Sequence, residues 1–409
     1  MKKILLVILI ISVTNSCDDY TPIRFIETNY SKESSEPNLH RSNSGEIYLS
    51  FISSNLETNE SQLLYSLLNY SKFSWNDFNF ITKSSEMFVN WADFPKITTN
   101  SSNGVSAHYL EMTSEEKYSY DIKILNSKNG GITWNKPIKL HNDNTKTEHG
   151  FVSTINIKDH FLSTYLDGRQ NELSNHNSSI KAQMTLRGTS YNIEGQIIDD
   201  KLIDDRVCDC CQTDLGITDL EIPIVVYRDR SEDETRDIYY SYLDINNTWS
   251  KPATVYNDNW IISGCPVNGP AISTFNNKSA VVWYTYTNNK SLIKIAFSND
   301  IAEGFNTPIE VNADNPIGRV DIELIDGETA LISYMDNIDG NTFVKLHMVN
   351  RSGNQNKFLL VDESSKERSS GFPKIVLDKK RNLTIIAWTE VSNKSKIKTA
   401  LIDNSFFYD

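Results

Sequence analysis

The sequence predicts an all-β fold in which one four-stranded unit recurs along the chain. Most of the 409 residues fall into short segments rich in Ile, Val, Tyr and Thr, and no stretch beyond about ten residues keeps a helical period. An apolar segment that closes on an aromatic residue recurs seven times, at intervals of 58, 56, 62, 56, 51 and 54 residues. These aromatics are Phe51, Tyr109, Tyr165, Tyr227, Trp283, Tyr334 and Trp388. Four-stranded units of this length stack around an axis because a single unit cannot bury both of its faces. We therefore expect a β-propeller of seven blades, with six blades, a large β-sandwich or a solenoid as alternatives.

The first segment of the chain has the composition of a secretory signal. Lys2 and Lys3 precede an apolar run over residues 4–13, which is too short to span a bilayer, and Cys17 follows. This arrangement resembles a bacterial lipobox, with Thr14 where Leu is usual, and implies that Cys17 becomes a lipidated first residue. A plain signal peptide with an incidental cysteine is the alternative. We expect an extracytoplasmic lipoprotein, held at the outer membrane on the cell surface or in the periplasm.

The domain organisation follows from these two observations. Residues 1–16 are expected to be the signal peptide, residues 17–36 a tether with a closing strand, and residues 37–409 one propeller domain. Each aromatic segment is followed by a second predicted strand, at 63–69, 118–127, 180–187, 237–244, 292–300, 342–350 and 396–403. A Trp- or Pro-marked third segment follows at 134–140, 249–256 and 305–311. The last unit has only three strands, so we expect the apolar segment 22–28 to supply its fourth strand and close the ring.

Charge and composition exclude two classes of protein. The chain has 40 Lys and Arg against 53 Asp and Glu, a net charge of −13, whereas a protein that tracks nucleic-acid phosphates needs a basic surface. Its 39% hydrophobic and 11% aromatic content lies outside the range of disordered chains. We expect a folded monomer that binds no nucleic acid and meets the membrane only through its lipid anchor.

One turn carries a family signature. Residues 127–134, Ser-Lys-Asn-Gly-Gly-Ile-Thr-Trp, match the Asp-box pattern Ser-x-Asp-x-Gly-x-Thr-Trp, with Asn129 in place of Asp. In such a turn the two glycines accept positive φ, the Asn side chain binds the turn backbone, and Trp134 packs between blades. Weaker copies lie at 244–249 and 298–305. We expect all three on the face opposite the functional one.

Further stretches at 90–95, 148–151, 206–213, 227–237, 264–270 and 318–321 resemble secreted bacterial proteins of the sialidase-like, Asp-box family, often called exo-α-sialidases. The resemblance covers nearly the whole mature chain. It implies a propeller that binds acidic or complex glycans and a glycoside hydrolase activity of the exo-α-sialidase type.

Repeat alignment predicts where functional residues gather. In a four-stranded blade, the segment that precedes the innermost strand and the segment that follows the second strand reach the same face, here called the mouth face. The residues with charged, amide or thiol groups at these two points are Asp93, Glu111, Glu148, His149, Asp167, Arg169, Cys210, Cys211, Gln212, Arg228, Asp229, Arg230, Cys265, Asn268, Arg319, Asp321, Asp336 and Glu390. The alternative for each acid is a structural role, capping a strand end or pairing with a nearby arginine.

Sialidase chemistry assigns roles to several of these residues by resemblance. That family holds a substrate carboxylate with three arginines, attacks with a tyrosine activated by a glutamate, and uses an aspartate as acid/base. Arg169, Arg230 and Arg319 would form the clamp, and Asp93 or Asp229 would be the acid/base. Glu148 and His149 are further catalytic candidates, and the remaining substrate-binding candidates are Asp167, Arg228, Asn268 and Asp321.

The sequence also departs from the sialidase pattern. The Phe-Arg-Ile-Pro segment of that family is absent, with only a scrambled Pro-Ile-Arg-Phe at 22–25. Sialidases have six blades, and the Tyr/Glu pair has no evident counterpart.

Four cysteines remain after Cys17, namely Cys208, Cys210, Cys211 and Cys265. Outside the cytoplasm an even number indicates disulfides, and three connectivities are open. A bond between the adjacent Cys210 and Cys211 would be strained, so we expect Cys265 to pair with one of the cluster. The alternative is a copper or zinc site, with His149 as a further ligand.

These observations leave three functions open. The leading hypothesis is a surface-anchored glycan-binding propeller that hydrolyses its ligand and needs no cofactor. The alternatives are a non-catalytic module for glycan capture or protein docking, and a metal-dependent enzyme centred on the cysteines.

Overall fold

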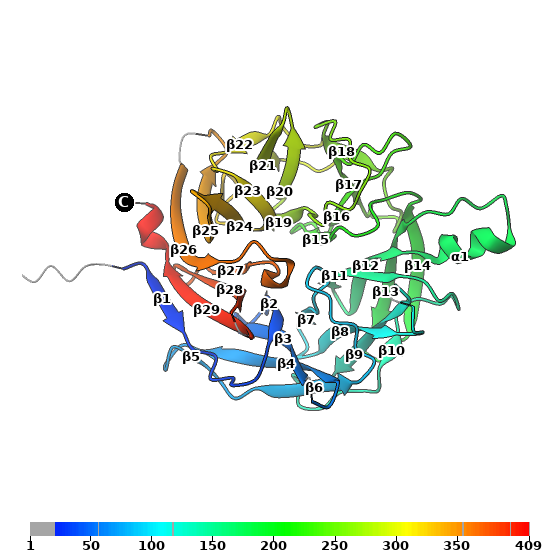
Figure 1. Cartoon of the computed structure of the whole chain (residues 1–409), viewed down its shortest axis with the longest axis horizontal. Coiled ribbons are helices and arrows are strands. Elements are labelled where there is room, and N and C mark those ends of the chain that lie inside the picture. The colour runs from blue at the N-terminus through cyan, green and yellow to red at the C-terminus, as the bar shows by residue number, and fades with distance from the viewer. Residues whose placement is uncertain (1–20, 56, 117, 354–355, 393, 409) are drawn as a thin grey trace, which may run out of the picture.

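A computed structural model describes residues 21–408 apart from 56, 117, 354–355 and 393. Seven antiparallel sheets are arranged in a ring, which confirms the seven-bladed propeller (Figure 1). The expected signal peptide and Cys17 lie outside the described residues. Among the described residues, no helix has the length and apolarity needed to cross a membrane.

The first three blades each run from an inner strand at the axis to an outer strand. Blade 1 contains β2 (Ser35–Arg41), β3 (Ile47–Asn55) and β4 (Glu60–Asn69), and both β5 (Ser74–Trp75) and β6 (Asn79–Ser84) pair with β4. Blade 2 contains β7 (Ile97–Thr99), β8 (Val105–Met112), β9 (Tyr120–Ser127) and β10 (Ile138–Lys139). Blade 3 contains β11 (His149–Ile157), β12 (His160–Asp167), β13 (Thr185–Asn192) and β14 (Ile197–Asp204). The helix α1 (Arg169–His176) lies in the connection between β12 and β13.

Blades 4 to 6 repeat this order. Blade 4 contains β15 (Asp214–Ile217), β16 (Pro223–Arg228), β17 (Ile238–Tyr242) and β18 (Ala253–Tyr256). Blade 5 contains β19 (Ala271–Phe275), β20 (Lys278–Thr287), β21 (Lys290–Ser298) and β22 (Ile309–Val311). Blade 6 contains β23 (Pro316–Leu324), β24 (Thr329–Ile338), β25 (Asn341–Asn350) and β26 (Asn356–Ser364).

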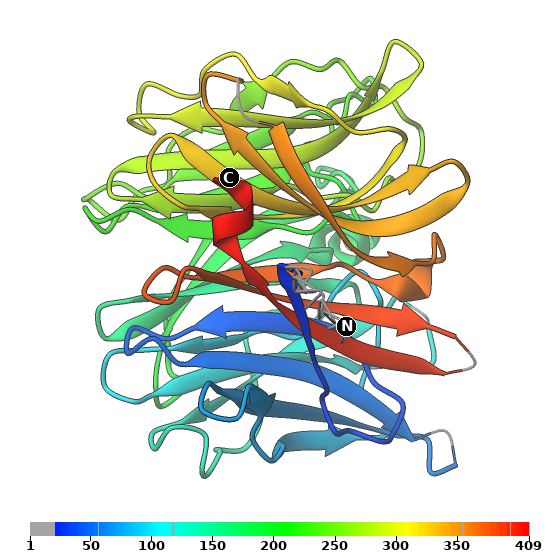
Figure 2. The ribbon, with the colours of Figure 1, turned by 90° about the vertical axis from the view of Figure 1, so that its left-hand side faces the viewer.

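Blade 7 joins the two ends of the chain. It contains β27 (Lys374–Asp378), β28 (Leu383–Val391) and β29 (Ser395–Asp403), and its outer strand is β1 (Ile23–Ile26). Strand β1 pairs antiparallel with β29, and the two lie side by side in Figure 2. Short 3₁₀ helices precede β27 (Arg368–Ser370) and follow β29 (Asn404–Phe407). The segment 22–28 therefore closes the ring as predicted, and blade 1 begins two residues before the expected boundary at residue 37.

The core lies between neighbouring blades. The seven repeated aromatics are all 3% exposed or less. Trp283 of blade 5, for example, belongs to one cluster with Val226 and Val255 of blade 4. The repeated apolar and aromatic residues of the second strands therefore pack each blade against the next.

The Asp-box turn has the expected geometry. Gly130 and Gly131 adopt φ values of 69° and 89°. Asn129 Oδ1 accepts a hydrogen bond of 3.0 Å from the Thr133 backbone N–H. The Trp134 ring lies 6.2 Å from that of Tyr65 in blade 1, so the turn fixes the contact between blades 1 and 2.

The inner strands line a central channel of about 410 Å³. Lys96 lies 3.5 Å from Asp214, and Lys374 lies 3.7 Å from Asp321. In these two ion pairs of the channel wall, each lysine charge is balanced by an aspartate. The ring of Phe94 lies 4.5 Å from the Lys374 ammonium group, towards the mouth face. The prediction that Asp321 contacts a substrate at the mouth is corrected here, because this side chain lines the channel and binds the Ile375 backbone N–H.

Candidate functional site

A groove of about 710 Å³ lies on the mouth face between blades 3 and 4. Its walls come from α1 and the segment after it, from the end of β14, and from the loop that follows β16. The polar and aromatic side chains in its lining include Gln170, Lys181, Gln183, Asp204, Arg206, Asp229, Arg230 and Tyr239. This volume is within the range of small-ligand sites in proteins.

Two carboxylates in the groove have perturbed acidities. Asp204 ends β14 and Asp229 follows β16, so neighbouring blades contribute one each. Burial, together with the nearby charge of Asp204, raises the pKa of Asp229 to about 7. Burial also raises the pKa of Asp204, although Tyr227 donates a hydrogen bond of 2.6 Å to its carboxylate. The charge of Asp204 therefore favours the protonated form of Asp229 near neutral pH.

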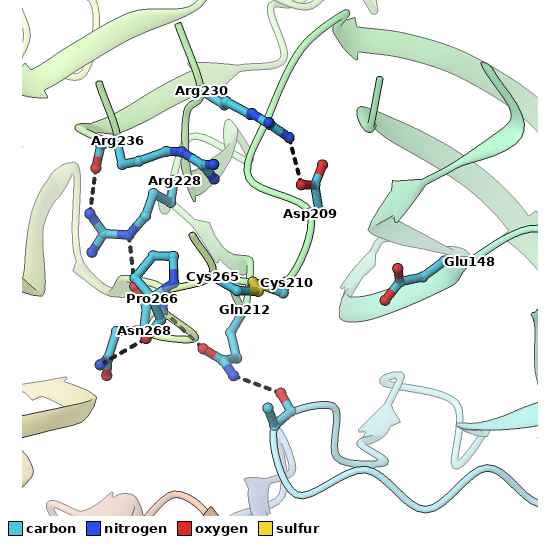
Figure 3. The surroundings of a disulfide bond; sticks show 12 residues. Glu148, Asp209, Cys210, Gln212, Arg228, Arg230, Arg236, Cys265, Pro266 and Asn268 are labelled. Carbon is cyan, nitrogen blue, oxygen red and sulfur yellow. Dashed lines mark hydrogen bonds and ion pairs between the residues drawn. A yellow bond between two sulfur atoms is a disulfide. The ribbon is translucent and has the colours of Figure 1, made fainter. Parts of the chain in front are cut away.

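Two arginines supply hydrogen-bond donors beside these acids. Arg230 binds Asp209 at 2.6 Å and Glu234 at 2.9 Å, which holds its guanidinium group at the edge of the groove (Figure 3). Arg206 lies 3.8 Å from Glu234, and its Nε atom has no hydrogen-bond partner among the described residues. This Nε atom is buried, so Arg206 faces the groove with the rest of its side chain, which is 26% exposed.

A second group of acids lies closer to the axis. Tyr120 donates a hydrogen bond of 2.5 Å to Glu148, whose pKa burial raises to about 7. Asp93 is only 5% exposed, accepts a hydrogen bond from the Phe151 backbone, and has a pKa that burial raises to about 7. Figure 3 shows the Glu148 carboxylate opposite the disulfide loop. A Tyr/Glu pair is therefore present, but Tyr120 is 0% exposed, which encloses the hydroxyl that a sialidase would use as nucleophile.

His149 belongs to a buried ionic cluster instead of the groove. Its ring stacks on that of His141, with centroids 3.7 Å apart and planes at 7°, and both rings approach the Asp143 carboxylate at 2.8–3.2 Å. A histidine nitrogen binds a metal ion in the plane of its ring. Two stacked, nearly parallel rings therefore cannot bind the same metal ion with good geometry. The guanidinium group of Arg169 binds Asp167 at 2.6 Å and approaches Asp143 at 3.3 Å. The cluster thus joins blade 2 to blade 3.

The structure does not bring the three predicted clamp arginines together. Arg169 pairs with Asp167 in blade 3, and Arg230 pairs with Asp209 and Glu234. Arg319 is 4% exposed, donates to the carbonyls of Gly371 and Glu367, and lies 5.0 Å from the Trp91 ring. Each guanidinium group has its own surroundings, so the clamp assignment is corrected.

Three further candidates also have structural roles here. Arg228 is 1% exposed, and the carbonyls of Asn268, Arg236 and Tyr284 accept its N–H groups. Asn268 accepts a hydrogen bond from the Arg319 backbone and donates to Ile317. Asp167 is 0% exposed. Their polar groups hold blades and loops together and are not left for a substrate.

The disulfide joins the loops that precede blades 4 and 5. Cys210 and Cys265 are bonded with their Cα atoms 6.2 Å apart, which is one of the pairings expected for Cys265 (Figure 3). Gln212, two residues on, donates to the Ala92 carbonyl and accepts from the Gly269 N–H. Cys208 and Cys211 keep their thiols. A copper or zinc site at the cysteines stays a prediction that metal analysis would test.

Of the predicted site residues, Asp229 and Arg230 line the groove and Glu148 lies nearer the axis. Three other groove residues were not predicted, because they lie outside the two points of the repeat that the sequence analysis considered. Asp204 lies on the outer strand of blade 3, Arg206 lies in the segment before blade 4, and Tyr239 lies on β17. The sequence signal for Asp204 is the acidic end of the fourth strand of a blade, which also reaches the mouth face.

The fold and groove define a seven-bladed propeller with an acidic pair on its mouth face. A scan against protein-family models finds no match, and neither does a search of curated proteins. Among solved structures, an ulvan lyase of a polysaccharide lyase family is similar with a TM-score of 0.57 and 10% identity, over 93% of this chain and 96% of that chain. An α-L-arabinofuranosidase from Fusarium graminearum is similar with a TM-score of 0.51 and 11% identity, over 94% and 98%.

A Hadza microbial sialidase is also similar, with a TM-score of 0.48 and 12% identity, and 74% of this chain spans 63% of its length. At these identities the likenesses concern the fold. The likenesses to the ulvan lyase and the arabinofuranosidase agree with the β-propeller that the Asp-box resemblance implied.

Proposed function

We propose that this chain is a carbohydrate-active propeller that binds an acidic glycan in the groove between blades 3 and 4 and hydrolyses a glycosidic bond there. The observation that carries the proposal is the acidic pair in that groove. Asp229 holds a proton to about pH 7, and Asp204 is its partner from the neighbouring blade. Glycoside hydrolysis needs two carboxyl groups of this kind, one protonated and one ionised.

The roles follow from the two environments. Asp229 donates its proton to the glycosidic oxygen as the bond to the anomeric carbon breaks. Asp204, which accepts a hydrogen bond from Tyr227, is the ionised partner that acts on the attacking water or on the anomeric carbon. Tyr239 supplies an aromatic face at the groove wall, and sugar rings bury apolar C–H groups against such faces.

The donors beside the acids indicate an acidic sugar. Three basic residues, Lys181, Arg206 and Arg230, lie in the same lining. A carboxylate or sulfate on the sugar would accept from this side while the acidic pair faces the scissile bond. Among the fold neighbours, the ulvan lyase was solved bound to a chain of glucuronate and sulfated rhamnose, which supports an acidic substrate. The arabinofuranosidase supports a glycan substrate in general.

The location proposed for this activity is extracytoplasmic, with Cys17 as the lipid anchor. The Cys210–Cys265 disulfide supports an oxidising compartment, since such bonds are rare in the cytosol. Palmitate labelling of the wild-type chain and of Cys17→Ser tests the anchor, and we expect the label only in the wild type.

Asp229→Asn tests the hydrolase directly. With a panel of chromogenic sialosides, uronides and neutral glycosides, we expect turnover of an acidic substrate that the variant lowers by about 10²- to 10⁴-fold, the usual contribution of a general acid. The matched control is Asp159→Asn, whose side chain is 96% exposed in the turn between β11 and β12, and which should retain full activity. Because Asp229 must be protonated, the wild-type rate should fall as pH rises above about 7.

Two results would contradict the proposal. If Asp229→Asn were as active as the wild type, the groove would not be the active site. If no glycoside were cleaved while a glycan array still showed binding, the hydrolase interpretation would fail and the capture module would take its place.

A further inference from the structure

The loop 208–211 before blade 4 holds two thiols close together. Cys208 and Cys211 are 0% and 1% exposed, and each retains its thiol. Residues 209–210 form a turn, so the two cysteines are the first and last residues of a four-residue reversal. The Cα atoms at the ends of a β-turn lie within about 7 Å, and disulfides span about 4.4 to 6.8 Å.

The sulfur atoms of this loop are also close together. The Sγ atoms of Cys208, Cys210 and Cys211 all lie within 4.8 Å of one another. The neighbouring Cys210 is bonded to Cys265, and formation of that bond itself requires an oxidant of thiols.

We propose that Cys208 and Cys211 form a second disulfide in the mature protein, so that two adjacent bonds fix the loop beside the groove. The reaction needs an oxidant of the dithiol–disulfide exchange class, the same class that the Cys210–Cys265 bond requires. One thiolate attacks a sulfur of the oxidant's disulfide and forms a mixed disulfide. The second thiolate then attacks that bond, so two thiol protons go to solvent and two electrons reduce the oxidant.

The timing of the exchange follows from the burial of the loop. Both thiols are buried in the folded chain, so the exchange takes place during folding, before blade 5 packs on blade 4.

The second bond has a consequence for the groove, and this consequence rests on the proposed function. Asp209 lies between the two bonds, and its carboxylate holds Arg230 at 2.6 Å. One bond closes the turn around Asp209 and the other ties it to the loop before blade 5. The two bonds together position Arg230 on the groove wall.

Peptide mapping without reductant tests the bond independently of any activity. Protein is alkylated while unfolded without reductant, and is then cleaved by a protease that cuts before aspartate. Cleavage before Asp209 separates Cys208 from Cys210 and Cys211, so a Cys208–Cys211 bond keeps the two fragments linked until reductant is added. We expect this linkage, and no alkylated cysteine in the chain from Cys208 to Cys265.

Variants make the test quantitative. Cys208→Ser should expose one titratable thiol, from Cys211. The matched control pair Cys210→Ser with Cys265→Ser should expose none, because Cys208 and Cys211 remain bonded. Cys208→Ser with Cys211→Ser should lower Tm by a few degrees, since the bond restricts the unfolded chain.

Either of two results would overturn the proposal. Alkylation of both Cys208 and Cys211 in the wild type would show that they remain thiols. Stoichiometric copper or zinc that is lost on Cys208→Ser would show that they are metal ligands. Neither result bears on Asp229, so the failure of this bond and the failure of the hydrolase are distinguishable.

Discussion

Single buried acids determine much of the chemistry on the mouth face. Burial raises the pKa of Asp93, Glu148 and Asp229 to about 7 each, because water that would solvate the carboxylate is excluded. Asp229 lines a groove that a ligand can reach, whereas Asp93 is almost fully enclosed. The same shift therefore bears on the proposed catalysis at Asp229 and on stability at Asp93.

Asp93→Asn should change how stability depends on pH. In the unfolded chain Asp93 loses its proton near its ordinary pKa of 3.8, but the folded protein keeps it to about 7. Between these values the folded state binds more protons, so the free energy of unfolding falls as pH rises, by about 4 kcal/mol in total. The variant has no such proton, and its amide oxygen can still accept from the Phe151 N–H.

Denaturant unfolding at pH 4, 5, 6, 7 and 8 checks this prediction. The difference between variant and wild type should grow in favour of Asp93→Asn up to about pH 7 and then level off. Asp159→Asn provides the exposed control. Parallel stability curves for Asp93→Asn and the wild type would show that Asp93 ionises normally in the folded protein.

At the scale of elements, blades 4 and 5 are joined by polar contacts at the mouth face as well as by apolar stacking. Arg228 ends β16 of blade 4, and its guanidinium group reaches the carbonyls of Asn268, before β19, and Tyr284, in β20. The Cys210–Cys265 bond joins the same two blades. Arg228 and this bond therefore both add to the apolar stacking between blades 4 and 5.

Arg228→Met should weaken this interface strongly. The methionine fills part of the volume but leaves three buried carbonyls without donors, so we expect the free energy of unfolding to fall by about 3 kcal/mol or more. Arg381→Met, at a side chain that is 42% exposed and pairs with Asp378, should change it by less than about 1 kcal/mol. Equal effects in urea titrations of the two variants would contradict a structural role for Arg228.

At the scale of the whole molecule, stability depends on closing the ring. Four residues of β1 pair with β29, and the side chain of Ile26 is only 4% exposed in a cluster with Ile385 and Leu401. The outer strand of blade 7 therefore comes from the opposite end of the chain. Without it, β29 would become an uncovered edge next to apolar side chains.

A chain that begins at Asn29 should be less stable than one that begins at Thr21. Loss of β1 removes the strand pairing and the Ile26 contacts, so we expect a Tm lower by several degrees and self-association through the exposed edge of β29. Thermal unfolding and light scattering measure the two effects. A monomer with unchanged Tm would show that β1 does not close the ring.

The sequence by itself determined the architecture of this protein. Seven aromatic segments, the Asp-box turn at 127–134, the closing strand at 22–28 and the reach of Cys265 to the cysteine cluster were all predicted. These features depend on local periodicity and on the order of the repeats, and both can be read directly from the sequence.

Only the tertiary structure decided which residues share a site. The groove combines Asp204 from the outer strand of blade 3 with Asp229 from the loop after the second strand of blade 4, and that pairing depends on how one blade is rotated against the next. Burial likewise separated Arg230, which lines the groove, from Arg228 and Arg319, whose donors bind backbone carbonyls. The sequence around a charged residue does not show whether its side chain faces a ligand or a carbonyl group, because the partner comes from a different blade.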